Sequence, residues 1–474
     1  MAVADTPDSE EPGESSGTSS STSARGFTSA RGFTEGGVGK HLLRLGSYMA
    51  MGTVTMNVAQ IAEAIYLGIL GTEALAAMGF AFPLTVTLFA FAGGIGSGAS
   101  SVIARAFGSG EMDRVSLLIT HAQILSLAVG LTLAFLGYVY ATEIVTLLGA
   151  KDLVLELTVT YLQVYMIGVP FFLLSIVGST LLRAAGNASS PGIIMTIGSI
   201  TQVVLGPILI FGWFGIPELG IAGAAWAYVL SRVASVLLYS LILLRDRLMT
   251  LSLKGMWASW VSIMHVGFPA IASGLVMPIS MLVITRLLAG HGHEVVAAYN
   301  VASRVETIAH MILWSCSSSA EPFIGQNWGA RQLDRVKRAL FLCNAFCLAW
   351  GALTFIVMIT FGTYFVGLID NNPKVVEAAY WFFVFIPLSI GLMGMIQVAN
   401  SSFNARGLPM PALAISILRS FVVGIPLAIL GDIYWGYIGV FASTAVCNVL
   451  VGVVAWQWNK ASVAQQSRGW ATAA

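Results

Sequence analysis

The sequence predicts an all-α integral membrane protein with twelve transmembrane helices in two six-helix lobes. Three observations predict this class: the composition, a succession of apolar runs, and an internal repeat. Of the 474 residues, 57% are hydrophobic and only 9% are charged, and the mean hydropathy is +0.84. A soluble domain carries about 25% charged residues, and so few polar side chains could not cover the surface of a chain this long. Most of the chain is therefore expected in lipid.

Twelve runs are long enough to cross a bilayer, which takes about 20 mostly apolar residues. Short breaks marked by polar, Gly or Pro residues separate them. The runs lie at residues 45–70, 74–104, 116–141, 155–182, 191–212, 220–244, 260–288, 295–328, 339–368, 377–403, 411–431 and 436–458. If the N-terminus is cytoplasmic, seventeen of the 23 Lys and Arg residues fall on the cytoplasmic side and three on the other. This bias predicts a multi-pass protein of the plasma membrane with both termini inside.

The first stretch of the chain differs from the rest. Residues 1–40 are rich in Ser, Thr, Gly and Pro and contain no basic residue before Arg25. Such a stretch buries too little apolar surface to order itself, so a disordered N-terminal tail is expected. The N-lobe then covers residues 41–247, the C-lobe residues 248–460, and a C-terminal tail residues 461–474.

The two lobes are predicted from a repeat at a fixed offset of 221 residues. Its clearest block aligns residues 101–115 with 322–336, and both segments contain Asp-Arg-Val. After small loop deletions, Gly220 aligns with Gly436. Six helices per repeat is an even number, so both halves enter the membrane from the same side and are related by a pseudo-twofold axis along its normal. Two such lobes facing a cleft suit transport by alternating access.

Several classes of function are disfavoured. The net charge of +1 gives no surplus that points to nucleic acid. The four cysteines fall in apolar runs, which argues against a disulfide framework and a zinc site. No nucleophile–base pair or metal constellation is visible, so we expect neither an enzyme nor a cofactor.

Ionisable residues inside membrane helices are functional candidates, because each costs at least ~2.5–3.5 kcal/mol to place there. Glu63 stands in an apolar run with no basic residue within one helical turn. Burial away from a cation favours the protonated carboxyl, which suits a proton carrier. A glutamate facing a wet vestibule near the helix end is the alternative.

A second polar group lies in the span 295–328. Glu306 and His310 share one helix face at i,i+4, and Arg304 points elsewhere along the same helix. This patch could face a ligand, bind a second proton, or link helices structurally. Arg232 and Arg419 are expected to satisfy helix-end carbonyls or to snorkel towards the membrane surface.

The chain resembles the multidrug and toxic compound extrusion (MATE) family, closest to its DinF-like branch. The resemblance covers nearly everything after residue 40 and rests on residues 67–84, 182–191 and 220–227. Its most specific part is IGQNWGARQLDRVKRA at residues 324–339. The resemblance implies a twelve-helix antiporter that expels amphipathic, often cationic compounds against an inward flow of protons or sodium.

The same resemblance implies a coupling site in the N-lobe. Glu63 stands where the family usually has an aspartate, and Gln202 and Gly206 replace residues that are often Asn and Asp. Tyr228 stands at a position that is usually Thr. A sodium site needs several oxygen ligands, and one of two carboxylates is missing here, so proton coupling through Glu63 is favoured over sodium. Gln60, Asn57, Gln202 and Tyr228 are the expected hydrogen-bonding neighbours of Glu63.

Three functions remain open from the sequence. The first is a cation-coupled efflux antiporter for amphipathic small molecules. The second is a flippase for a lipid-linked saccharide, for which the three arginines within helices give thin support. The third, a receptor or channel without coupled transport, is disfavoured by the duplicated lobes. Besides its substrate and membrane lipid no partner is indicated, and we expect a monomer.

Overall fold

A computed structural model describes residues 32–367 and 372–472, and these residues form long helices without a β-strand. The N-lobe contains seven helices and a short 3₁₀ turn: α1 (Val38–Leu70), α2 (Thr72–Gly108), α3 (Met112–Val139), α4 (Ala141–Leu147), α5 (Asp152–Ala184), α6 (Ser190–Phe211), η1 (Trp213–Gly215) and α7 (Gly220–Arg245). The C-lobe contains α8 (Met256–Ala289), α9 (His293–Gly329), α10 (Leu333–Gly367), α11 (Pro373–Ala405), α12 (Pro409–Ile417), the π-helical turn η2 (Leu418–Gly424) and α13 (Ile425–Thr472).

The predicted twelve spans can be followed along these helices. By length and hydropathy, ten helical stretches of the described chain could cross a membrane, and the last of them runs from Pro409 to Arg468. That stretch turns at Gly436, where φ is 60° and ψ is −147°, a conformation open to glycine and strained for other residues. It therefore makes two spans. The twelfth is α9, the least apolar of the long helices and long enough to cross.

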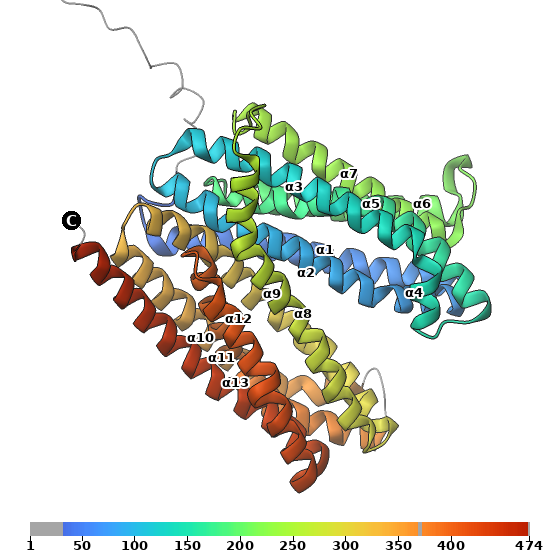
Figure 1. The fold of residues 1–474 in the computed structure, drawn as a ribbon. Coiled ribbons are helices and arrows are strands. Elements are labelled where there is room, and N and C mark those ends of the chain that lie inside the picture. Colours follow the sequence, from blue (N-terminus) through green and yellow to red (C-terminus); the bar gives the residue numbers. More distant parts are fainter. Residues whose placement is uncertain (1–31, 368–371, 473–474) are drawn as a thin grey trace, which may run out of the picture.

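The helices form two bundles that diverge from one end, with α1 to α7 in one and α8 to α13 in the other (Figure 1). Between the lobes, α2 packs on α8 and α9, and α1 packs on α9. Helices α2 and α8 approach closely because small residues lie at their contact. A Cβ added at Gly98 would collide with the backbone of Ile263 in α8, so two helix backbones touch there as in membrane helix pairs with small residues at the interface.

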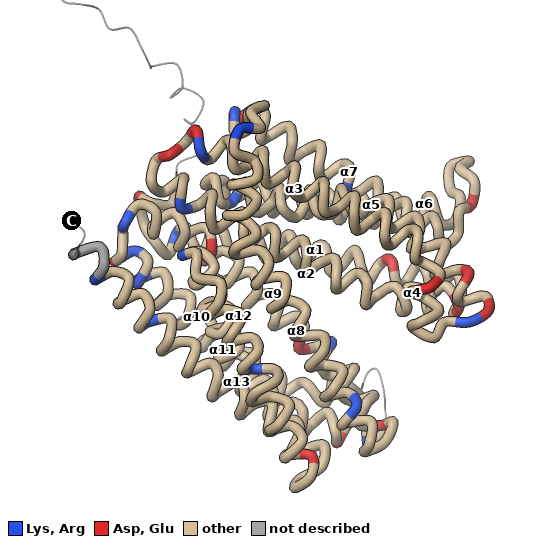
Figure 2. The backbone as a smooth tube through the Cα atoms, in the orientation of Figure 1, with Lys and Arg blue, Asp and Glu red and all other residues tan. Residues whose placement is uncertain are grey.

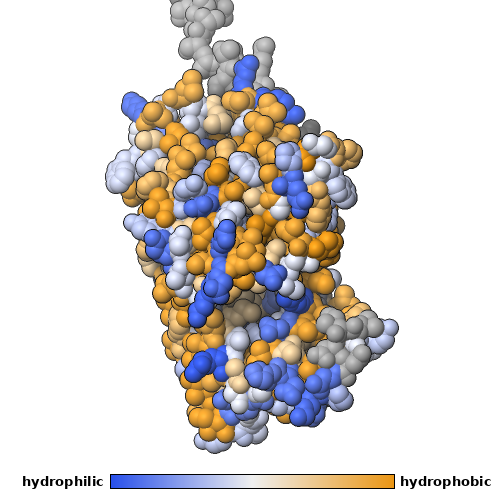
Figure 3. All heavy atoms as spheres, turned by 90° about the vertical axis from the view of Figure 1, so that its right-hand side faces the viewer, coloured by the Kyte–Doolittle hydropathy of each residue, from blue (hydrophilic) through white to orange (hydrophobic). Residues whose placement is uncertain are grey.

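The end where the lobes meet carries most of the Lys and Arg side chains (Figure 2). We call it the basic end. It includes residues at the helix termini that meet there: Arg105, Arg183 and Arg245 in the last turns of α2, α5 and α7, Arg335 in the first turn of α10, and Arg406 directly after α11. The lobes separate towards the opposite end. A view of that opposite end shows a hollow between the two lobes, with hydrophilic residues near its rim (Figure 3).

The two chain ends differ from the expectation for tails. Residues 1–31 lie outside the described residues, but residues 38–40 already belong to α1. Residues 32–37, which we call the N-terminal strap, are bound to the C-lobe: the Phe33 amide donates to Gln326 (2.7 Å), and Arg335 donates to the carbonyls of Phe33 (2.8 Å) and Gly36 (2.6 Å). For residues 32–40 the prediction of disorder is wrong, because these partners lie about 300 positions away in sequence.

The C-terminal residues also continue the fold. Helix α13 runs on to Thr472, so the tail expected from residue 461 is helical almost to its end. Val463 is buried, and Arg406, directly after α11, donates hydrogen bonds to Ser462 and Gln466, both at 3.0 Å. These contacts hold the last turns of α13 against α11.

Candidate functional site

Glu63 lies inside the N-lobe, between α1 and the helices α5, α6 and α7. Only 7% of its surface is exposed. The Tyr161 hydroxyl of α5 donates to Glu63 Oε1 at 2.8 Å, and Gln202 Nε2 of α6 donates to Oε2 at 3.0 Å. Each carboxyl oxygen therefore has one donor from a different helix, which is the satisfaction that a buried polar group requires.

Gln202 links this carboxyl to a buried arginine. Its side-chain oxygen accepts from Arg232 Nη2 of α7 at 3.4 Å, a long contact. Arg232 is 6% exposed and also lies over the ring of Tyr228, 5.1 Å from the ring centroid. A chain of polar contacts thus runs from α1 through α6 to α7 within one lobe.

Aromatic rings continue the site along α5. The ring of Tyr165 stacks on that of Tyr228 with centroids 4.2 Å apart, and it lies 5.7 Å from the ring of Tyr161. All three tyrosines are buried. Buried aromatic rings screen charge poorly, so a change in the charge of the Glu63 carboxyl would be felt strongly here.

A cavity of about 10 Å³ adjoins Glu63 and Gln202. This is near the smallest volume that holds one water molecule. Gly206 lines it, and a Cβ at Gly206 would come within 2.9 Å of the Tyr66 ring. Tyr66 therefore occupies the space that a second acidic side chain at position 206 would need.

The sequence-predicted neighbours of Glu63 divide into two sets. Gln202 makes the expected hydrogen bond, and Tyr228 joins the same cluster through Tyr165 and Arg232. Asn57 instead donates to the Thr53 carbonyl of its own helix at 2.9 Å, and Gln60 is exposed. Among the described residues, no hydrogen bond joins Asn57 or Gln60 to Glu63.

The second polar patch belongs to the other lobe. On α9, His310 Nε2 lies 3.0 Å from Glu306 Oε1, as their i,i+4 spacing predicts. Arg304 is exposed and lies apart from this pair, also as expected. The structure does not bring these residues into the Glu63 cluster.

The expectation for the two arginines within helices is wrong. Arg232 lies inside the N-lobe and contacts Gln202, and Arg419 Nε donates to Asn448 Oδ1 at 3.0 Å inside the C-lobe. Neither side chain reaches a helix-end carbonyl in these contacts. Their partners come from neighbouring helices about 30 residues away, so local sequence could not indicate them.

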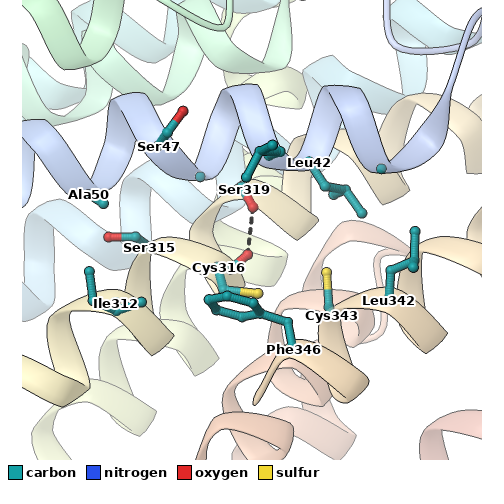
Figure 4. A pocket seen from close by; sticks show the side chains of 13 residues that line it. Leu42, Ser47, Ala50, Ile312, Ser315, Cys316, Ser319, Leu342, Cys343 and Phe346 are labelled. Atoms are coloured by element: carbon teal, nitrogen blue, oxygen red, sulfur yellow. Dashed lines mark hydrogen bonds between the residues drawn. The ribbon is translucent and has the colours of Figure 1, made fainter. Parts of the chain in front are cut away.

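A separate cavity of about 330 Å³ lies between α1 of one lobe and α9 and α10 of the other (Figure 4). Its lining is mostly apolar and includes Leu42, Ile312, Cys343 and Phe346. The Ser319 hydroxyl at its edge donates back to the Cys316 carbonyl at 2.7 Å. None of the described residues that line this cavity is charged, so it suits hydrocarbon better than an ion.

Sequence reasoning missed three parts of the site and its surroundings. Tyr161 and Tyr165 are aromatic residues at i,i+4 within an apolar span, a spacing that predicts one face but not its partner. Glu321 lies on α9 between the lobes, where Ser97 of α2 donates to it at 2.9 Å. An acidic residue inside the span 295–328 was the available signal for Glu321.

The chain is similar to known proteins along most of its length. The chain matches the MatE family model over residues 49–208 and 269–430, once in each lobe. Among curated proteins it is 31% identical over 423 residues to the FAD transporter of Shewanella oneidensis, covering 88% of this chain and 94% of the relative. It is 25% identical over 430 residues to the probable multidrug resistance protein YoeA of Bacillus subtilis, covering 88% and 93%.

Solved structures show the same fold. The MATE transporter VcmN of Vibrio cholerae in its bent form matches with a TM-score of 0.86 and 26% identity, over 93% of this chain and 98% of that one. A MOP superfamily transporter from Pyrococcus furiosus matches with a TM-score of 0.85 and 24% identity, over 91% and 97%. The chain therefore belongs to the MatE family and is a membrane transporter with the family's twelve-helix, two-lobe fold. The DinF-like branch stays a prediction.

Proposed function

We propose that this member of the MatE family is a secondary-active efflux antiporter that exchanges amphipathic, cationic compounds for protons carried by Glu63. The observation that carries the proposal is the buried carboxyl of Glu63, whose two oxygens accept hydrogen bonds from Tyr161 and Gln202 on two other helices. A group held in this way couples its own charge to the packing of α1 against α5 and α6.

The coupling follows from what protonation does to these bonds. An ionised carboxylate accepts both donors strongly, because hydrogen bonds to charged groups are worth about 1.5–3 kcal/mol. A protonated carboxyl needs them less, so protonation loosens α1 from its neighbours. Each unit of pH difference supplies about 1.4 kcal/mol per proton, enough for a tenfold substrate gradient at one proton per substrate.

Protons fit this site better than sodium. A sodium ion takes several oxygen ligands, and the cluster offers one carboxylate, the Gln202 amide oxygen and the Tyr161 hydroxyl, which is already bound to the carboxylate. The amide oxygen already faces the Arg232 guanidinium, whose positive charge repels a bound cation. Tyr66 blocks the place of a second carboxylate at position 206.

The substrate would bind in the hollow between the lobes (Figure 3). We propose a monomer in the plasma membrane with both termini and the basic end in the cytoplasm, supported by the distribution of Lys and Arg. In that topology the described conformation is closed to the cytoplasm and open to the outside.

A second candidate substrate is a flavin dinucleotide. It is favoured by the relative from Shewanella oneidensis, which is named an FAD transporter and is 31% identical to this chain. The flippase remains the alternative for a protein that moves neither substrate.

The test is transport by purified protein in liposomes under a pH gradient alone or a sodium gradient alone. Ethidium and FAD fluorescence are followed separately, for the wild type, for Glu63→Gln, and for Glu306→Gln as a matched carboxyl control from the other lobe. We expect ethidium transport under the pH gradient, lost in Glu63→Gln and kept in Glu306→Gln.

The other outcomes decide among the alternatives. Transport driven only by sodium would overturn proton coupling. Transport of FAD without transport of ethidium would show that the substrate is a flavin dinucleotide and not an amphipathic cation. Transport of neither compound would favour the flippase.

A further inference from the structure

The N-terminal strap, residues 32–37, continues directly into α1 of the N-lobe but is bound by side chains of the C-lobe. Arg335 of α10 donates to the carbonyls of Phe33 (2.8 Å) and Gly36 (2.6 Å), and Asn327 of α9 donates to the Phe33 carbonyl at 3.2 Å. Hydrogen bonds from an ionised donor are stronger than those between neutral groups. The strap therefore connects the two lobes at the basic end through strong bonds.

The side chain and the amide of Phe33 add to this connection. The ring is 2% exposed, stacks on Phe323 of α9 with centroids 6.3 Å apart, and meets the ring of His41 edge-on at 5.6 Å. The amide donates to Gln326 Oε1 at 2.7 Å. Gln326 Nε2 in turn donates to the carbonyl of Ala184, the last residue of α5 in the N-lobe, at 2.8 Å. One side chain of the C-lobe thus binds the strap and the N-lobe together.

The distance along the chain between Arg335 and α1 is short. Helix α1 begins at Val38, two residues after Gly36, whose carbonyl Arg335 binds. Two residues span at most about 7 Å when fully extended. The start of α1 therefore cannot move far from α10 unless the strap leaves Arg335 or the first turn of α1 unwinds.

Cavities adjoin the strap on both sides. The cavity of about 330 Å³ between α1 and α10 reaches Gly39, two residues beyond the strap (Figure 4). A second cavity, of about 910 Å³, lies between the strap and the N-lobe, where Asn187 of the α5–α6 loop and Arg245 of α7 line it. The strap is therefore held chiefly by its bonds to the C-lobe and has space beside it to move away.

We propose that the N-terminal strap is an autoinhibitory segment that holds the basic end closed, and that it must leave Arg335 and the site of Phe33 before the basic end opens. An interaction that exists in one of two conformations shifts the population towards that conformation. The inference rests on alternating access of the two lobes, which the proposed function includes, but not on the compound transported or on the coupling ion.

The sequence offers a matched control for Phe33. The hexapeptide SARGFT occurs at residues 23–28 and again at 29–34, so Phe27 and Phe33 stand in the same local sequence. Phe27 lies outside the described residues. Phe33→Ala removes the ring that the C-lobe binds, and Phe27→Ala makes the same chemical change six positions earlier.

Helix α10 offers a control for Arg335. Arg338 is exposed one turn further along, and its guanidinium lies over the ring of Phe341, 5.8 Å from the centroid. Among the described residues no hydrogen bond joins Arg338 to the strap. Arg335→Ala and Arg338→Ala therefore remove the same charge from the same helix, and only the first cuts bonds to the strap.

The test measures the distance between the lobes at the basic end, with the full chain in lipid nanodiscs. Spin labels go on the exposed positions Asp113 of α3 and Ala461 of α13, after the four native cysteines are replaced by alanine. Neither position belongs to the strap or to its binding site. The distance distribution gives the ratio of closed to open molecules for each variant.

We expect Phe33→Ala and Arg335→Ala each to lower the ratio of closed to open molecules about tenfold. A buried aromatic ring and a hydrogen bond to a charged group each contribute enough free energy for that factor. Phe27→Ala and Arg338→Ala should keep the wild-type ratio.

A double variant separates the strap from the packing of the C-lobe itself. Arg335 also donates to Asn327 Oδ1 at 2.7 Å, so Arg335→Ala changes a contact within the C-lobe as well. If both substitutions act by releasing one strap, the free-energy change in Phe33→Ala/Arg335→Ala is smaller than the sum of the two single changes.

Two results would overturn the proposal. One is a ratio of closed to open molecules in Phe33→Ala equal to that of the wild type or of Phe27→Ala. The other is full additivity in the double variant, which would assign the effect of Arg335→Ala to the C-lobe alone. Because the readout is a distance, loss of proton-driven transport in the liposome assay would leave this test unaffected.

Discussion

In the N-lobe, Arg232 on α7 donates to Gln202 on α6, and in the C-lobe, Arg419 on η2 donates to Asn448 on α13. Each of these pairs joins an arginine that is buried (Arg232) or half-buried (Arg419) to one side-chain amide. The amide and the arginine have exchanged helices, because Arg232 and Asn448 stand at equivalent distances from the aligned Gly220 and Gly436. In both lobes, the hydrogen-bond partner of this arginine within the membrane is a neutral amide.

The lobes differ in what lies beside that pair. At the offset of 221 residues, Glu63 and Tyr161 correspond to Ile284 and Phe382, so the C-lobe lacks both the carboxyl and its tyrosine. Asn448 donates instead to the hydroxyl of Ser389 at 3.0 Å. The C-lobe also contains the π-helical turn η2, a feature often found at functional positions.

The arginine–amide pair is therefore an element of the fold, while the carboxyl is an addition specific to the N-lobe. A structural pair should affect stability when it is cut in either lobe. Only the pair connected to Glu63 should also affect coupling.

The largest contrast is expected from cutting the amide in each lobe. Gln202→Leu removes both a donor to Glu63 and an acceptor for Arg232, and losing a hydrogen bond to a charged group costs about 1.5–3 kcal/mol. Proton-driven transport should fall about 10- to 100-fold. Asn448→Leu should lower the melting temperature in detergent while the transport of the folded fraction stays within about threefold. An equal loss of transport in Gln202→Leu and Asn448→Leu would mean that the two arginine–amide pairs contribute equally to coupling.

A smaller effect is expected from exchanging the hydroxyl between corresponding positions. Tyr161→Phe removes one donor to Glu63 and leaves the other, so transport under a pH gradient should fall about 3- to 10-fold. Phe382→Tyr adds a hydroxyl to a buried C-lobe position and should cost about 1–3 kcal/mol of stability. Thermal unfolding and liposome transport, measured on both variants, separate the two effects. Unchanged transport in Tyr161→Phe would show that the tyrosine hydroxyl does not contribute to coupling.

The smallest effect is expected in the α9 patch. The Glu306–His310 pair lies on one helix at i,i+4, a geometry worth about 0.3–0.5 kcal/mol. His310→Gln should therefore change the initial rate of proton-driven transport by less than about threefold. A loss as large as that of Gln202→Leu would reveal a second coupling site in the C-lobe.

Much of the fold could be predicted because it depends on properties that a single sequence displays. Apolar runs gave the twelve spans, and the fixed offset gave two lobes. Glu63 was identifiable because an acidic residue in such a run is costly. The break between the last two spans was also predicted close to Gly436, because the span 436–458 begins there and Gly436 aligns with Gly220.

The contacts of the site were less predictable because they join distant helices. Tyr161 is 98 residues from Glu63 in sequence, and the direction of Arg232 depends on a partner 30 residues away. Asn57 and Gln60 were expected near Glu63 because they precede it on α1. One of them bonds to its own backbone and the other is exposed, which helical spacing alone does not reveal.

The N-terminal strap has a consequence for how the chain is made. Phe33 is buried to 2% exposure and is bound by Gln326 and by Arg335, the latter 302 residues further along. At about 5–20 residues per second, a ribosome needs about 15–60 s to reach that arginine after it has passed Phe33. The strap therefore waits without its partners while the whole N-lobe is synthesised. Among the earliest described residues to leave the ribosome, it is among the last that can reach their final contacts.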